Sequence, residues 1–146
     1  MKTVKQQIVD FFAAKKLEVE FEASMYGFTA YVRDMVILGE KVDSVLIHWY
    51  DSGNRNTLSV NIIYDAVHIS PQLRRAVNMY NTHTSCWKAL INDDDEYGRP
   101  FLSFDCDCCY IQQDRIDEIL TSLFDDLADD DNEAYFFELL NSQKRS

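Results

Sequence analysis

Glycine and proline are scarce, with four glycines and two prolines among 146 residues. Four isolated glycines cannot build the loop that cradles phosphate groups, so nucleotide hydrolysis and dinucleotide oxidoreduction lack the backbone geometry they need. No Pro-rich or Gly/Ser-rich linker divides the chain, and no internal repeat is present. We therefore expect a single domain over residues 1–146 with a helical tail over about 129–146.

Long apolar runs are also missing. The apolar stretches fall far short of the roughly 20 residues that span a bilayer. The first twelve residues, MKTVKQQIVDFF, lack the apolar segment and the small-residue cleavage site of a secretory signal. We expect a cytoplasmic chain that does not bind membranes, with its four cysteines reduced.

Basic residues are few in the last third of the chain. The whole chain carries 14 basic and 25 acidic side chains, which gives a net charge of −11. Residues 1–90 are close to neutral, whereas residues 91–140 hold 2 basic and 16 acidic side chains. A phosphate backbone would repel such a surface, which excludes nucleic acid as a partner. The acidity either solvates a helix face and a turn or selects a basic partner.

Catalytic and metal-binding motifs are absent. The three histidines, His48, His68 and His83, are dispersed, and no HExxH or GxSxG pattern occurs. The acidic turn Asp93–Glu96, followed by Gly98, does not place oxygen ligands at the positions of a calcium loop. We therefore expect no enzymatic activity, no cofactor and no bound metal.

The periodicity of apolar residues changes several times along the chain. Thr3 and Gln6 form a capping box for a first helix, whose apolar stripe begins at Val4. Alternation then predicts strands, with an extension of the second through Val36–Leu38 left open. These expected strands are Leu17–Glu22, Phe28–Arg33, Ser44–Tyr50 and Thr57–Tyr64. In the last of them the apolar residues face one way, and the polar residues Thr57, Ser59 and Asn61 face the other.

The second half begins with Ser70-Pro71, a serine cap followed by proline at the first helical position. A hairpin of Cys86–Asn92 and Phe101–Cys109 follows, and a third helix starts near Asp114. The segment Asp129–Asn132, which begins with three aspartates, interrupts that helix. The sequence predicts an α+β fold, a twisted antiparallel sheet of about five to six strands with flanking helices, in the order α-β-β-β-β-α-β-β-α.

The cysteine-rich segment Cys106–Cys109 allows two interpretations. Strand alternation puts Cys106 and Cys108 on the apolar face with Phe104, and Cys109 on the other face, which favours structural thiols. The alternative is a metal- or redox-responsive regulator that uses Cys106, Cys108, Cys109 and Cys86.

An aromatic segment near the end of the chain also has two interpretations. It either packs back on the core as a final helix or offers an apolar patch to a partner or a second subunit. The residues we single out as candidate partner contacts are Tyr135, Phe136, Leu139 and Leu140.

Four segments together resemble the YbjN-like family of bacterial proteins, which are candidate sensory-transduction regulators. They are Val67–Pro71, Ala76–Asn81, Cys86–Asn92 and Phe101–Phe104, and Asn78 and Asn81 occupy matching positions. The resemblance covers nearly the whole chain. It implies a fold similar to type III secretion chaperones, which are small acidic homodimers, and it brings no catalytic residues. The cysteine-rich last strand and the aspartate-interrupted C-terminus depart from the family pattern.

These observations lead to one hypothesis and one alternative. The hypothesis is a non-enzymatic protein-binding module, chaperone-like or regulatory, that acts on another protein and can form a homodimer. The alternative is the cysteine-based metal- or redox-responsive regulator.

Thiol labelling of the folded protein tests the expected strand register. We expect Cys109 to react first, because alternation places Cys106 and Cys108 in the core and Cys109 outside. Rapid labelling of Cys106, read out by peptide mass mapping, would show that the register is wrong by one residue.

Overall fold

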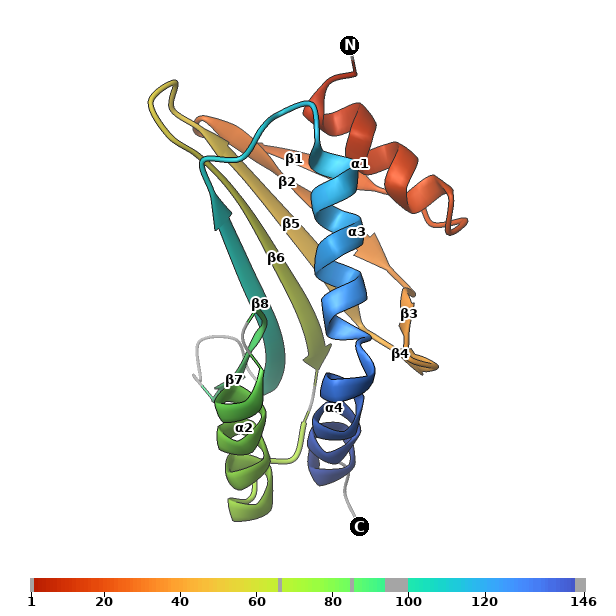
Figure 1. The fold of residues 1–146 in the computed structure, drawn as a ribbon, viewed down its shortest axis with the longest axis vertical. Coiled ribbons are helices and arrows are strands. Elements are labelled where there is room, and N and C mark those ends of the chain that lie inside the picture. Colours follow the sequence, from red (N-terminus) through yellow and green to blue (C-terminus); the bar gives the residue numbers. More distant parts are fainter. Residues whose placement is uncertain (1, 66, 85, 94–99, 144–146) are drawn as a thin grey trace.

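The computed structural model describes residues 2–65, 67–84, 86–93 and 100–143. Its centre is a twisted antiparallel sheet of six strands in the order β1-β2-β5-β6-β8-β7 (Figure 1). The strands are β1 (Glu20–Ser24), β2 (Gly27–Arg33), β5 (Ser44–Asp51), β6 (Asn56–Asp65), β7 (Lys88–Asn92) and β8 (Phe101–Cys109). A separate two-stranded hairpin, β3 (Val36–Ile37) and β4 (Glu40–Lys41), follows β2.

The described residues form four helices, which pack in two pairs. They are α1 (Val4–Ala13), α2 (Pro71–His83), α3 (Ile116–Leu127) and α4 (Asp130–Gln143). Helix α1 lies against α3, and α2 lies beside α4 at the other end of the sheet (Figure 1). Within the described residues, no helix has both the length and the apolar content that a bilayer span requires.

Alternation along the strands decides which side chains enter the core. The residues of β6 and β8 that pair across the ladder share a face, so Val60 lies opposite Cys106 and Ile62 opposite Phe104. These four side chains are buried, whereas the residues between them are mostly half-exposed. The predicted α+β class, the antiparallel sheet and the buried face of β6 are therefore confirmed.

The helix starts agree closely with the sequence patterns. Thr3 and Gln6 form the reciprocal capping box at α1, and the Ser70 hydroxyl accepts a hydrogen bond from the Leu73 amide at α2. Gly27 opens β2, where any Cβ would meet the Trp49 carbonyl oxygen at 1.8 Å. Only glycine fits so close to the neighbouring strand.

The element order differs from the expectation at two points. The β3–β4 hairpin occupies the region around Val36 that the pattern left open. The aspartate run does not interrupt one helix but begins another, because the Asp129 carboxylate accepts a hydrogen bond from the Asp131 amide at 2.8 Å. Acidic side chains favour a helix N-terminus, so the same residues that end α3 start α4.

The candidate partner-contact residues require a correction. Phe136, Leu139 and Leu140 are buried in the chain's own core, and the Phe136 ring lies 5.3 Å from that of Phe104. Tyr135 stacks on His83, with ring centroids 4.6 Å apart. The apolar stripe of α4 is therefore used by α2 and the sheet, and it forms no open patch.

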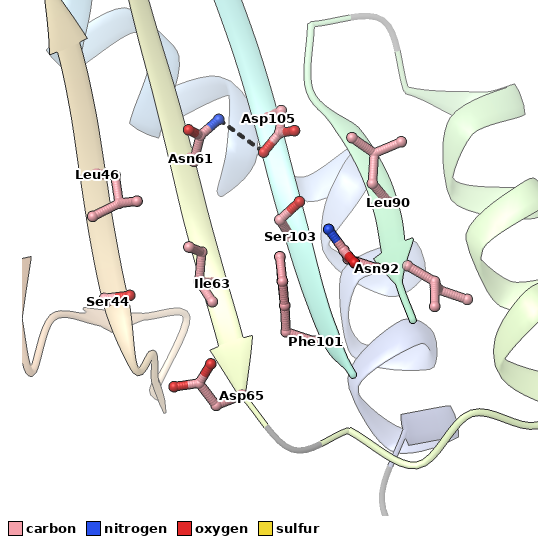
Figure 2. Close-up of a pocket in the computed structure, with 11 residues that line it drawn as sticks. Ser44, Leu46, Asn61, Ile63, Asp65, Leu90, Asn92, Phe101, Ser103 and Asp105 are labelled. Carbon is pink, nitrogen blue, oxygen red and sulfur yellow. Dashed lines mark hydrogen bonds between the residues drawn. The ribbon is translucent and has the colours of Figure 1, made fainter. Parts of the chain in front are cut away.

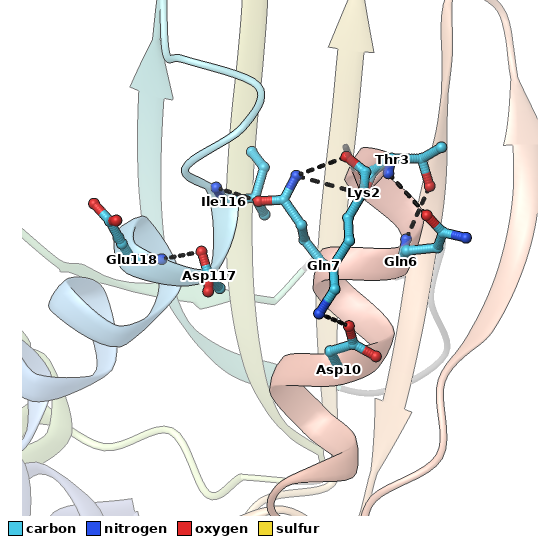
Figure 3. A network of polar contacts seen from close by, with 8 residues as sticks. All are labelled: Lys2, Thr3, Gln6, Gln7, Asp10, Ile116, Asp117 and Glu118. Atoms are coloured by element: carbon cyan, nitrogen blue, oxygen red, sulfur yellow. Dashed lines mark hydrogen bonds and ion pairs between the residues drawn. The ribbon is translucent and has the colours of Figure 1, made fainter.

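The side chain of Gln7 joins the first and third helices (Figure 3). Its Oε1 accepts a hydrogen bond from the Ile116 amide at 2.9 Å, and its Nε2 donates to the Gln113 carbonyl oxygen at 2.6 Å. Arg115, at the N-cap of α3, makes no side-chain cap. Gln7 thus satisfies a helix-end amide that would otherwise be buried without a partner.

We expect Gln7→Ala to lower the free energy of unfolding by about 2 kcal/mol, because two backbone groups lose their buried partner. Urea denaturation followed by circular dichroism measures this change. Gln6→Ala is the matched control, since Gln6 makes only an exposed bond within its own cap. Equal losses in the two variants would contradict a role for Gln7 between the helices.

Candidate functional site

The second face of the six-stranded sheet carries no helix among the described residues. Its side chains line up in rows across the strands, because the ladders place paired residues on the same face. One row runs Tyr31, Leu46, Asn61, Asp105 and Lys88, and the next runs Thr29, His48, Ser59 and Asp107. We call this surface the open face.

A chain of hydrogen bonds crosses the open face from β2 to β8. The Thr29 hydroxyl lies 2.9 Å from His48 Nδ1, and His48 Nε2 lies 3.0 Å from Asn61 Oδ1. Asn61 Nδ2 then donates to Asp105 Oδ1 at 2.9 Å. Four strands each contribute one side chain to this chain of contacts.

The direction of these bonds follows from the Asn61 amide. Because its nitrogen donates to Asp105, its oxygen accepts, and His48 Nε2 must carry the hydrogen. His48 Nδ1 is then free to accept the hydrogen of the Thr29 hydroxyl. In each of the three bonds the donor lies on the β2 side and the acceptor on the β8 side, so this chain of hydrogen bonds ends at the Asp105 carboxylate on β8.

Asp105 is held in a partly dry environment. Burial raises the pKa of its carboxyl group above the ordinary value, while hydrogen bonds from Ser103 and Asn61 act in the opposite direction. Burial is the larger of these effects. The carboxylate therefore carries a cost in stability near neutral pH that the two donors only partly offset.

A hollow of about 780 Å³ lies on the open face between β5 and β7 (Figure 2). Asn61 and Asp105 lie at one end of it, and Ser103 lies farther along β8, between Asp105 and Phe101. Apolar side chains form much of its lining, namely Leu46, Ile63, Leu90 and Phe101. We call this hollow the groove, because it opens to solvent along the sheet.

Charges around the groove are mainly negative. Asp65 and Asp105 line it, and Asp107 lies one row away, where it accepts a hydrogen bond from the Ser59 hydroxyl. Lys88 is the nearby cation, but its Nζ donates to the carbonyl oxygens of Asn81 and Thr84 at the end of α2. The positive charge is therefore drawn toward the helix, where it complements the helix dipole.

The outer edge of the sheet at β7 is partly capped. The Asn81 amide donates to the Ala89 carbonyl oxygen at 2.9 Å and accepts from the Ala89 amide at 2.7 Å. These two bonds occupy the Ala89 amide and carbonyl groups, through which another strand would otherwise pair with the edge. Asn81, one of the two family-matching asparagines, thus has a structural role at this edge.

The four cysteines lie on two sides of β8. Cys106 is buried and Cys109 is exposed, as the alternation predicts, whereas Cys108 is only half-buried and not enclosed in the core as expected. Cys86 is also half-buried. Cys109 lies 3.2 Å from Arg55 Nη2, and that contact lowers the pKa of its thiol. Within the part of the chain that the structure describes, no three His, Cys, Asp or Glu side chains gather as metal ligands would.

Sequence reasoning did not single out the residues that meet on the open face. Alternation indicated that Thr57, Ser59 and Asn61 point away from the core, but it could not show which strand lies next to β6. The acidic turn that the sequence did single out falls mainly on residues 94–99, outside the described residues. Of its side chains, Asp93 pairs with Arg74 at 3.3 Å.

The pH dependence of stability tests the environment of Asp105. Because its pKa is raised in the folded chain, the folded state binds more protons than the unfolded state in this range, and stability falls as pH rises. Between about pH 3 and pH 7, we expect Asp105→Asn to become progressively more stable relative to the unsubstituted chain.

Urea midpoints across that pH range measure the difference. Asp107→Asn is the control, because it removes the same charge two positions along the same face. A difference that shrinks as pH rises would contradict burial as the main influence on Asp105.

Comparison with known proteins gives one structural match to report. No protein-family model matches the sequence, and no curated protein matches it. The crystal structure of YbjN from E. coli, described as a candidate transcription regulator, is similar over 92% of this chain and 93% of that chain, with 11% identity and a TM-score of 0.48.

Proposed function

We propose that the chain is a non-enzymatic protein-binding module whose open face takes a polypeptide segment of mixed apolar and basic character. The observation that carries this proposal is the apolar groove on an acidic sheet face that no described helix covers. A sheet face turned to water ordinarily alternates polar residues with the buried row. Here four apolar side chains stand in its place.

The apolar part of the groove supplies area for binding. Leu90 is 49% exposed, although it belongs to a paired strand, and Leu46, Ile63 and Phe101 are half-buried. The volume of about 780 Å³ is of the size that takes several side chains of a ligand. An apolar surface rimmed by polar groups is typical of protein interaction sites.

The acidic part of the groove supplies selectivity. Burial makes the charged form of Asp105 unfavourable, and the Asn61 side chain, at the end of the hydrogen-bonded chain, donates directly to its carboxylate. A lysine or arginine of the partner would remove that unfavourable charge by pairing with it. A residue that lowers stability while facing a groove is more readily explained by binding than by folding.

The capped edge favours the groove over strand addition. Because Asn81 already satisfies the amide and carbonyl groups of Ala89, a partner strand would first have to displace it. Binding by a strand added to β7 would leave the groove unused. We therefore place the partner across the open face.

Peptide binding tests this proposal directly. An array of synthetic peptides pairs apolar residues with Lys and Arg in one set and with Glu in a matched set. We expect the basic set to bind, with affinity that falls as salt rises. The double substitution Ile63→Ser and Leu90→Ser should weaken that binding about tenfold or more, because it removes apolar contact area.

Val36→Ser is the matched control, since Val36 is 59% exposed on β3 and lies outside the groove. Equal binding of the acidic and basic sets, or full binding by the double variant, would overturn the proposal.

A second copy of the chain is the other occupant that this face could take, and it is the homodimer that the sequence led us to expect. Light scattering at low and high salt separates the two, because two acidic faces repel each other less when salt screens them. A monomeric mass at about 100 μM and high salt would exclude the dimer, since weak association becomes visible only near that concentration.

A further inference from the structure

Two thiols lie close together on the covered side of the sheet, away from the groove. Cys86 Sγ and Cys106 Sγ are 3.2 Å apart, closer than sulfur atoms that merely pack. Cys106 belongs to β8, whereas Cys86 precedes β7, so the contact joins two segments twenty residues apart. We propose that Cys86 and Cys106 are a redox site that forms a reversible intramolecular disulfide.

Each cysteine lies beside a residue that is held in the core. Cys106 lies opposite Val60 in the β6–β8 ladder. Cys86 is next to Trp87, whose indole nitrogen donates to the Leu123 carbonyl oxygen at 2.8 Å in the core. The sulfur atoms therefore need to close only the last part of the distance, without moving a strand.

The other cysteines are poorly placed to bond with Cys106. Cys108 is two residues along the same strand, and two residues of extended chain separate parallel side chains by about 7 Å. A disulfide needs Cβ atoms about 3.5–4.5 Å apart. Cys109 points to the opposite face, where it contacts Arg55. Cys86 is the partner that the geometry selects.

The reaction needs an oxidant, and a low-molecular-weight disulfide supplies it. Cys86, the more exposed of the pair, loses its proton and attacks one sulfur of the reagent, whose S–S bond breaks and releases one thiol. Cys106 then loses its proton and attacks the Cys86 sulfur, which releases the second thiol. The two protein thiols lose two electrons and two protons, and the reagent becomes two thiols.

Burial of Cys106 slows the second step, its attack on the Cys86 sulfur. It raises the pKa of the Cys106 thiol, so the attacking thiolate is scarce near neutral pH. Proximity to Cys86 compensates, because the attack is intramolecular. The site is therefore slow to oxidise and stable once formed, in contrast to exposed Cys109.

The disulfide would close a loop that contains all of β7 and the part of β8 up to Cys106. Both strands line the groove, β7 through Leu90 and β8 through Phe101. Oxidation would tie the hairpin at the end away from its turn and restrict its opening. The proposal concerns the thiols themselves and holds whether or not the groove binds a peptide.

The experiment incubates the folded, reduced full chain with oxidised glutathione and maps its peptides by mass spectrometry. We expect a linked peptide that contains Cys86 and Cys106 and has lost the mass of two hydrogens. The thermal midpoint should rise on the order of 10 °C, as for closure of a loop of this length, and return after treatment with dithiothreitol.

Cys86→Ser should abolish the linked peptide and the thermal shift together, while Cys109→Ser should keep both. Cys86 is half-buried, so its serine variant is expected to fold, and circular dichroism checks that it does. The proposal is overturned if the folded chain gives only glutathione adducts, or links these cysteines only in urea. It is also overturned if Cys86→Ser retains the full thermal shift.

Discussion

The pairing of β6 with β8 decides the character of both faces of the sheet. It holds Val60 opposite Cys106 on the covered face and Asn61 opposite Asp105 on the open face. A slip of one residue would exchange the faces of one strand and place a carboxylate in the core. Burying an unpaired charge is so unfavourable that this register is strongly favoured. The core, the groove and the thiol pair all depend on it.

The open face contains one feature that supports the fold and two that do not stabilise it. The chain of hydrogen bonds takes one side chain from each of four strands, so it supports the fold by linking those strands. In contrast, the apolar groove stays exposed to water and the Asp105 carboxylate is partly desolvated, so neither feature stabilises the isolated chain. Sequences normally agree with their fold at every level, and departures concentrate where a protein has a function.

Local patterns predicted most of the fold because they act within one element. Alternation identified the buried face of β6 and the positions of Cys106 and Cys109, and cap residues located the starts of α1 and α2. Periodicity shows that α4 has an apolar face but cannot show what covers it, which is why the sequence leaves open whether Phe136 and Leu139 contact the core or a partner. The contacts of Gln7 with Ile116, and of Asn61 with Asp105, join distant segments. They become visible only when the packing of the helices and the order of the strands are known.

The strand order also governs how the chain folds as it leaves the ribosome. Strand β8 is the last to be made, yet it lies between β6 and β7. From Asp65, where β6 ends, to Phe101, where β8 begins, synthesis takes roughly 2–7 s. During that interval the inner edge of β6 has no partner, and its apolar row is open to pairing with other chains. The nascent protein is therefore most vulnerable to aggregation just before its sheet is completed, and insertion of β8 ends that exposure.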